Sequence, residues 1–244
     1  MTRLRIDVWS DIACPWCYVG KRRLEAALTG FEHRDQVDVV WRSFELDPSA
    51  PRIQPVDGDY AGRLARKYRT SEAEAQGRID QLVKVAAADG LDMRFDRIRP
   101  GNTFDAHRVL HLAHGGRRQD AVKERFMRGY FTDGAAIGDP AVVRELAVAA
   151  GLDGAEVDDV LATDRHADRV RADEALAREL DIRGVPCFVF DRRLGVSGAQ
   201  PADALRATMA EAWRTLEPAA AADRDREPAP ADADGDACGP DGCT

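Results

Sequence analysis

The chain has 244 residues, of which 44% are hydrophobic and 32% charged, and its formal net charge is −8. This length can bury a large core in one domain or two closely joined ones, and the acidic balance argues against a nucleic-acid-binding protein. No apolar run approaches the roughly 18 residues of a membrane span, and residues 1–17 lack the apolar segment of a signal peptide. We therefore expect a protein of the cytoplasm without a membrane partner.

The first forty residues predict a β-α-β unit. Residues 4–10 alternate apolar and polar side chains, as a half-buried strand does. A helix is expected to begin at Pro15, because proline is tolerated in the first turn, and to end at Gly30. A second strand starts at Val37, so the two strands should be parallel neighbours.

Residues 48–181 carry the signals of helices only. Ser71 and Glu74 form a capping box before an apolar stripe. Asp139 and Pro140 are typical of the start of another helix. The sequence therefore predicts an all-helical insertion at 48–181 within an α/β domain made of residues 1–47 and 182–217.

The last part of the chain predicts a hairpin, a helix and a tail. Residues 185–197 contain two strand-like runs around a short turn, and a helix begins at Pro201 and is expected to end at Pro218. Residues 218–244 are rich in Ala, Pro and Asp and carry a net charge of −5. Such a segment buries too little apolar surface to fold by itself, so we expect a disordered acidic tail.

The motif "CPWC" at Cys14 and Cys17 lies at the expected junction of strand and helix. A cysteine at a helix N-terminus has a stabilised thiolate, and a second cysteine three residues later can attack a disulfide formed by the first. We predict that Cys14 is an exposed nucleophile with a lowered pKa and that Cys17 resolves the mixed disulfide. A zinc site with Cys238 and Cys243, or plain burial of both cysteines, are the alternatives.

Val185-Pro186 directly precedes the predicted hairpin. An X-Pro bond in such a place is a candidate for the cis isomer, while an ordinary loop end before an edge strand is equally compatible with the sequence. In the first case, the loop would lie beside the dithiol, where Val185 and Trp16 could form an edge that pairs with an extended peptide.

Four motifs together resemble one family: "SDIACPWCYVGKRRLE", "NTFDAHRVLHLA", "RGVPCFVFDRR" and "VSGAQP". Over residues 4–216 the chain is similar to the DsbA-like thioredoxin-fold oxidoreductases, and most similar to their FrnE type. The resemblance implies a thioredoxin-like fold with a helical insertion, a cis-Pro at Pro186 and thiol-disulfide exchange at Cys14 and Cys17. It implies no cofactor beyond the redox-active disulfide.

The resemblance leaves the reaction partly open. Related proteins include 2-hydroxychromene-2-carboxylate isomerases and kappa-class glutathione transferases, but glutathione activation needs no resolving thiol such as Cys17. Neutral Trp16 adds no charge to stabilise Cys14, so we expect reduction or isomerisation of protein disulfides. The expected partners are protein thiols and disulfides, with glutathione or a thioredoxin-type reductant. Cys187, after Pro186, is interpreted as a core residue or as a third reactive thiol.

Two further groups of residues need an explanation. Cys238 and Cys243 enclose the turn sequence "GPDG", and we hypothesise that they are an auxiliary redox pair that exchanges disulfides with Cys14. The histidines at 107, 111 and 114 share a helix face, and we interpret them as surface or groove-lining residues in preference to metal ligands. The oligomeric state is not predicted.

Overall fold

The computed structural model describes residues 3–54, 59–113 and 117–224. A mixed four-stranded sheet has the order β2-β1-β3-β4, with β1 Leu4–Ser10, β2 Val37–Ser43, β3 Cys187–Phe190 and β4 Leu194–Ser197. Strands β1 and β2 are parallel, whereas β3 is antiparallel to both β1 and β4. The predicted parallel pair and the predicted hairpin are confirmed.

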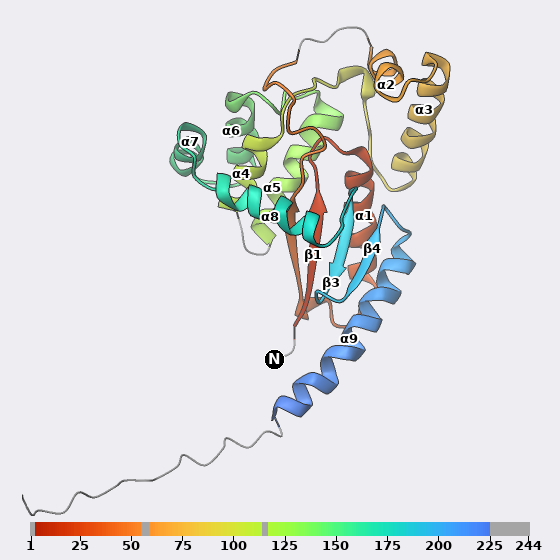
Figure 1. Cartoon of the computed structure of the whole chain (residues 1–244), viewed down its shortest axis with the longest axis vertical. Coiled ribbons are helices and arrows are strands. Elements are labelled where there is room, and N and C mark those ends of the chain that lie inside the picture. The colour runs from red at the N-terminus through yellow and green to blue at the C-terminus, as the bar shows by residue number, and fades with distance from the viewer. Residues whose placement is uncertain (1–2, 55–58, 114–116, 225–244) are drawn as a thin grey trace, which may run out of the picture.

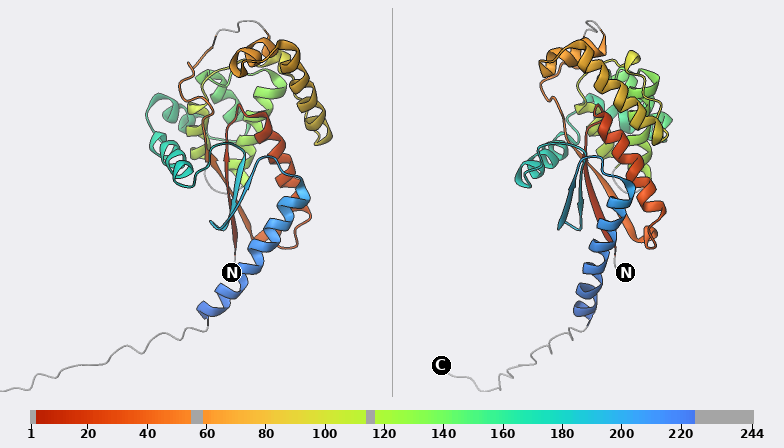
Figure 2. Two further views of the ribbon diagram at one scale, coloured as in Figure 1. Left: turned by 45° about the vertical axis from the view of Figure 1, so that its right-hand side comes forward. Right: turned by 90° about the vertical axis from the view of Figure 1, so that its right-hand side faces the viewer.

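Helices α1 Pro15–Thr29 and α9 Ala202–Arg224 cover one face of the sheet (Figure 1). The alternation along β1 places Leu4, Ile6 and Val8 on this face, where they share one apolar core with residues of both helices. Trp9 and Cys187 pack on the other face beside α8 Ala167–Glu179. Figure 2, seen from the side, shows this three-layer arrangement.

Seven α-helices of the described chain lie between β2 and β3 in the sequence. They are α2 Tyr60–Tyr68, α3 Glu72–Ala88, α4 Phe104–Leu112, α5 Arg117–Arg128, α6 Pro140–Ala149, α7 Gly154–Ala162 and α8 Ala167–Glu179, and a π-helical turn, Gly129–Asp133, continues α5. The capping box at Ser71 and Glu74 and the cap at Asp139 are confirmed.

The apolar core of these helices also contains Ile12, Cys14, Cys17, Tyr18 and Val19. The helical segment and the start of α1 therefore bury their side chains together, and the dithiol lies inside this shared core. The exact division of the chain at residues 48 and 181 stays a prediction.

The predicted end of the last helix at Pro218 is wrong. Helix α9 continues through Pro218 to Arg224. A proline inside a helix costs about 3 kcal/mol, but alanine has the highest helix propensity, and residues 219–222 are all alanine. Residues 225–244, the greater part of the predicted tail, lie outside the described residues.

Candidate active site

Cys14 is the N-cap of α1, and Cys17 lies within the first turn of that helix. The backbone carbonyl of Cys14 accepts a hydrogen bond of 3.0 Å from the amide of Cys17. Pro15 occupies the first helical position, where the missing N–H leaves no hydrogen bond unformed. The sequence therefore places both thiols at the positively polarised end of α1.

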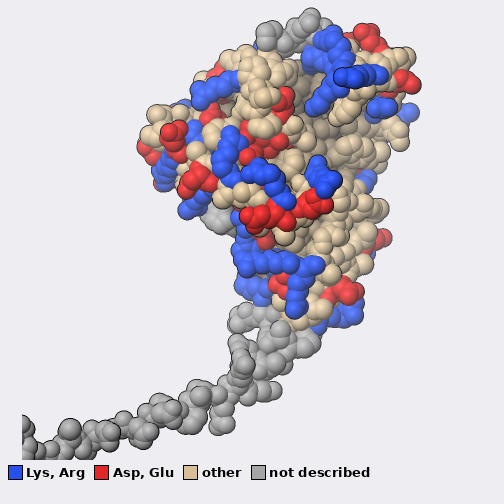
Figure 3. All heavy atoms as spheres, in the orientation of Figure 1, with Lys and Arg blue, Asp and Glu red and all other residues tan. Residues whose placement is uncertain are grey.

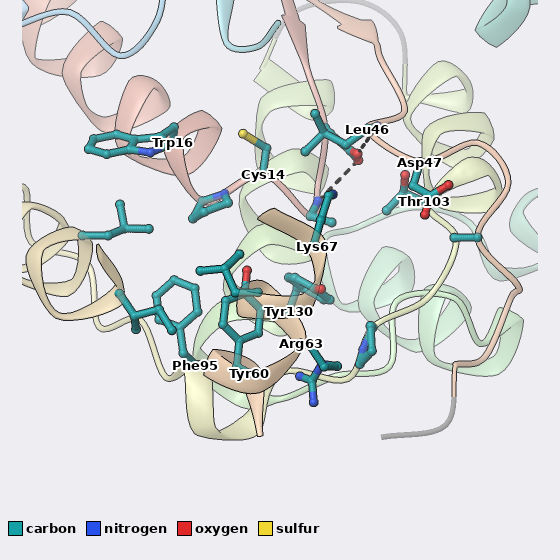
Figure 4. Close-up of a pocket in the computed structure, with 18 of the residues that line it drawn as sticks. Cys14, Trp16, Leu46, Asp47, Tyr60, Arg63, Lys67, Phe95, Thr103 and Tyr130 are labelled. Atoms are coloured by element: carbon teal, nitrogen blue, oxygen red, sulfur yellow. Dashed lines mark hydrogen bonds between the residues drawn. The ribbon is translucent and has the colours of Figure 1, made fainter. Parts of the chain in front are cut away.

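Cys14 is not exposed, and that prediction is wrong. Only 5% of the residue is accessible, and Cys17 is fully buried. Cys14 helps to line a cavity (Figure 4). Local sequence signals do not predict this burial, because the cavity next to the helix end is lined by residues of distant segments, such as Leu46 and Tyr130.

The predicted lowering of the Cys14 pKa is also wrong in direction. The hydrogen bond with the Cys17 thiol and then burial raise the pKa of Cys14, while the backbone amide of Cys17 acts in the opposite sense. The helix N-terminus is present, as expected. Its effect is outweighed because the thiolate would form out of water, beside a second thiol.

The loop before β3 closes over the dithiol. The peptide bond between Val185 and Pro186 is cis, and the Cys14 thiol donates a hydrogen bond of 3.6 Å to the carbonyl of Val185. A Cβ atom at Gly20 of α1 would lie 2.8 Å from Cγ of Pro186 and 3.2 Å from Phe188. The glycine therefore allows this loop to approach α1 closely.

The cavity at Cys14 has a volume of about 750 Å³, which is in the usual range for a small-ligand site. Trp16 stands at its edge with 43% of its surface exposed. Gly184 and Val185 form another part of the wall. The remaining wall includes aromatic and basic side chains of the helical segment: Tyr60, Arg63, Lys67, Arg78, Phe95 and Tyr130.

Asp11 is a buried acid next to the dithiol. No motif in the sequence predicts a role for it. Its carboxylate accepts hydrogen bonds from the amide of Leu46 at 2.8 Å and of Ala13 at 3.3 Å, and it lies 3.3 Å from Nε2 of His107. Burial alone would raise the Asp11 pKa, but His107 and these hydrogen bonds outweigh it and lower the pKa. Asp11 fixes the loop between β1 and α1.

The histidine interpretation needs correction. His107 and His111 are buried, not at the surface, and His114 lies outside the described residues. His107 meets Asp11, whereas Nε2 of His111 lies 3.1 Å from Oγ of Ser43 and 3.2 Å from the carboxylate of Asp173. The face of α4 that carries these histidines is not at the surface. It meets the loop after β1, strand β2 and helix α8.

Cys187 packs against Trp9 and Ala177, on the opposite side of the sheet from the core of α1 and α9. It is buried, and burial raises its pKa. This packing is that of a core residue, which agrees with the first of its two interpretations.

The remaining predicted site residues, Cys238 and Cys243, lie outside the described residues. Within the described part of the chain, no group of three or more His, Cys, Asp or Glu side chains is arranged to hold a metal ion. No described helix is long and apolar enough to cross a membrane.

A thioredoxin-like sheet with a dithiol at the start of its first helix defines a thiol-disulfide oxidoreductase. The comparisons with known proteins agree: residues 5–210 match the family model "DSBA-like thioredoxin domain". The chain belongs to this DsbA-like family.

Three relatives illustrate the match. The crystal structure of a probable DsbA oxidoreductase from Streptomyces coelicolor is 47% identical, with 99% of both chains covered and a TM-score of 0.80. The uncharacterized protein YwbO of Bacillus subtilis is 30% identical over 77% of this chain and 86% of its own. The cytosolic disulfide reductase DsbM of Pseudomonas aeruginosa, solved with GSH, has a TM-score of 0.60 at 20% identity, over 86% of this chain and 99% of its own, which is a likeness of fold.

Proposed function

We propose that the protein reduces or isomerises disulfides of other proteins in the cytoplasm, with Cys14 as the nucleophile and Cys17 as the resolving thiol. The observation that carries this direction is the burial of the Cys14 thiol beside Cys17, and both the second thiol and burial raise the pKa of Cys14. A dithiol protein is a strong oxidant when its reduced form is stabilised. A thiolate that burial disfavours gives the opposite tendency, which suits a reductant.

The surroundings of Cys14 support a polypeptide substrate. Val185, which accepts a hydrogen bond from the Cys14 thiol, and the exposed ring of Trp16 line the same cavity as Cys14, and the cavity continues along the helical segment. An extended chain with a cystine could enter between these residues and form backbone hydrogen bonds at the loop before β3. Reducing equivalents would come from glutathione or a thioredoxin-type protein.

A glutathione-dependent isomerase or transferase is the second candidate. Arg63 and Lys67 of α2 line the cavity, and Lys and Arg side chains gather over this end of the molecule (Figure 3). Such cations favour a small thiol that carries carboxylates. The resolving thiol at Cys17 weighs against this candidate, because transfer through glutathione does not use it.

The variants Cys14→Ser and Cys17→Ser separate these functions in insulin reduction and in refolding of a scrambled-disulfide protein, each with and without glutathione. We expect loss of reduction in both variants, with Cys17→Ser accumulating a mixed disulfide at Cys14. Activity that needs glutathione and survives Cys17→Ser supports the second candidate. Stoichiometric zinc in the purified protein would support a zinc-stabilised binding protein. Cys187→Ser is the matched control, since that thiol packs on another face.

The auxiliary pair Cys238 and Cys243 remains a proposal. If these thiols regenerate the dithiol, a chain that ends at residue 224 should react with substrate once as fast as the full chain does. The return of Cys14 and Cys17 to their starting redox state should then be slower. Equal regeneration rates with and without residues 225–244 would remove this role.

A further inference from the structure

Helix α2 turns one face toward the cavity at Cys14 (Figure 4). Residues three or four positions apart share a helix face, and the residues of α2 that line the cavity follow this spacing: Tyr60, Arg63, Leu64, Lys67 and Tyr68. The alanines at positions 61 and 65 are buried. The face toward the cavity therefore combines two cations with aromatic and apolar side chains.

The charge of this helix is opposite to that of the chain. Residues 60–69 contain four cations, Arg63, Arg66, Lys67 and Arg69, and no Asp or Glu, whereas the whole chain has a formal net charge of −8. On the adjacent helix α3, Arg78 adds a further cation to the cavity wall. This part of the surface therefore attracts an acidic partner.

The acids of the cavity wall are engaged by the chain itself. Asp11 is buried and accepts a hydrogen bond of 2.8 Å from the amide of Leu46. Asp47 accepts hydrogen bonds of 3.1 Å and 2.6 Å from the amide and the hydroxyl of Ser49. Within the described part of the chain, Lys67 forms no ion pair with a carboxylate, and its ammonium lies 5.9 Å from the centre of the Tyr68 ring. Lys67 is thus placed to bind a carboxylate from outside.

The same cavity also collects exposed apolar side chains. Six large apolar side chains are exposed among the described residues, and Trp16, Leu46 and Tyr68 of that set line this cavity. Apolar side chains that gather at one place on the surface indicate a binding site. Glutathione has no apolar side chain that could cover them. A segment of a protein can supply both the acidic and the apolar groups.

The cavity has room for several residues of such a segment. Its volume of about 750 Å³ corresponds to about 9 Å in each direction for a compact shape, and an extended chain advances about 3.3 Å per residue. An acidic side chain within about three residues of a cysteine held at Cys14 therefore lies inside the cavity.

We propose that the cavity selects disulfides of protein segments that carry an acidic residue within about three residues of the cysteine, and that Lys67 and Arg63 bind its carboxylate. This inference rests on the proposed dithiol function and names its substrate class. The reaction is unchanged: a disulfide RS–SR becomes two RSH, and its two electrons and two protons come from Cys14 and Cys17, which form a disulfide.

Pairs of synthetic cysteine peptides, each joined to itself as RS–SR, test the selection. The members of a pair differ only in Asp or Asn at one position within three residues of the cysteine. The reduced, full-length protein is used in excess and carries Cys238→Ser and Cys243→Ser, so that the tail thiols take no part. Each rate is divided by the rate of the same peptide with dithiothreitol, which removes the effect of the acid on the disulfide itself.

At low ionic strength and at the best position, we expect the Asp peptide to react about 10-fold faster than the Asn peptide, the lower range for a hydrogen bond to a charged group. The preference should nearly disappear in about 1 M salt.

Variants of α2 assign the preference to the cavity. Lys67→Gln should reduce it to about 3-fold, because Arg63 remains. Lys67→Glu should reverse it, so that a peptide with Lys at the same position reacts faster than the Asp peptide. Arg66→Gln removes a cation of the same helix that does not line the cavity, and it is the matched control with a wild-type ratio.

Four results overturn the inference or its basis. Equal rates of the Asp and Asn peptides at every position, or a wild-type ratio in Lys67→Glu, remove the selection while the dithiol function stands. If Lys67→Glu slows only the reaction with oxidised glutathione, glutathione is the ligand of these cations. An Asp preference that appears only in a chain ending at residue 224 assigns the cavity to the acidic tail. A protein that reduces none of the peptides contradicts the proposed function itself.

Discussion

The protein has two large buried cores of different character. The core between the sheet and helices α1 and α9 is built from aliphatic and aromatic side chains, among them Ile6, Phe190 and Met209. The core shared by α1 and the helical segment contains the thiols of Cys14 and Cys17, and Lys123 of α5 in that segment is fully buried. The first core has one task, which is to hold the sheet and its helices together.

The difference between the cores indicates which part of the molecule surrounds Cys14. The thioredoxin-like part supplies the helix end and the loop at Pro186, and the helical segment shares a buried core with Cys14 and lines the cavity next to it. Between the two parts lies a polar contact in which Asp173 of α8 binds Arg42 and the amide of Ser43 in β2. The helical segment therefore lines the candidate active site and also packs against the sheet.

Paired truncations of equal size give the largest expected effect. Phe126→Ala in the core of the helical segment and Phe190→Ala in the core of the sheet both remove a fully buried ring. Each should lower the free energy of unfolding by about 3–5 kcal/mol in denaturant titrations. Only Phe126→Ala should also change the alkylation rate of Cys14 in the folded protein. Equal changes of reactivity in both variants would contradict the division between the cores.

Loss of the polar contact comes next. Asp173→Asn should cost about 3 kcal/mol, because Arg42 would remain partly buried without its full ion pair. Asp158→Asn, which removes an exposed pair with Arg144, is the control and should change the unfolding free energy little. Equal losses of unfolding free energy in the two variants would show that the contact of Asp173 stabilises the protein no more than an exposed ion pair does.

The same contact makes the stability of the protein decrease at acidic pH. Burial alone would raise the pKa of Asp173, but His111, the Ser43 amide and Arg42 outweigh it, so the pKa is lowered in the folded protein. Its stabilisation is therefore fully present above the unfolded value of about 3.9 and is lost as the pH falls through the folded pKa. Unfolding titrations between pH 6 and 3 should show a smaller acid-dependent loss in Asp173→Asn than in the wild type.

Gly20→Ala tests the junction between the two cores with a smaller change. The added methyl would press on Pro186 and Phe188, and overpacking of this kind costs about 1–3 kcal/mol. We expect disulfide reduction to fall further than stability does, since the loop beside Cys14 must shift. Gly77→Ala on α3, where a Cβ would meet no atom within 4 Å, is the control. Unchanged activity in Gly20→Ala would show that the close approach is unnecessary.

The smallest effect concerns reactivity alone. Because the pKa of Cys14 is raised, iodoacetamide should alkylate it at pH 7 more slowly than it alkylates free cysteine, and the rate should still be rising at a pH where free cysteine has levelled off. A rate that is already maximal at pH 7 would contradict the raised pKa and, with it, the preference for reduction.

The sheet and the positions of the active-site residues follow from local signals in the sequence. The alternation in residues 4–10 and the proline at position 15 define β1 and the start of α1. The hairpin also follows from local signals, because two strand-like runs flank the three-residue turn of Asp191, Arg192 and Arg193. Such features depend on neighbours in the chain, which a sequence displays directly.

The errors concern groups whose surroundings come from distant parts of the chain. The cavity at Cys14 is lined by residues as far apart in the sequence as Leu46 and Tyr130. Lys123 lies in "RRQDAVKERFMR", a stretch in which every other Lys or Arg looks equally suited to solvent. A charged residue in an amphipathic helix is normally exposed, so the burial of Lys123 became visible only in the fold.

The course of helix α9 bears on the kinetics of any exchange with the last twenty residues. Its 23 residues correspond to about 34 Å of helix, and it leads away from the end of the molecule that carries α2 and α3 (Figure 1). The 13 residues between Arg224 and Cys238 span at most about 50 Å. Because this reach exceeds the length of α9, we expect the tail thiols to react with the dithiol of their own chain, at a rate that does not depend on protein concentration.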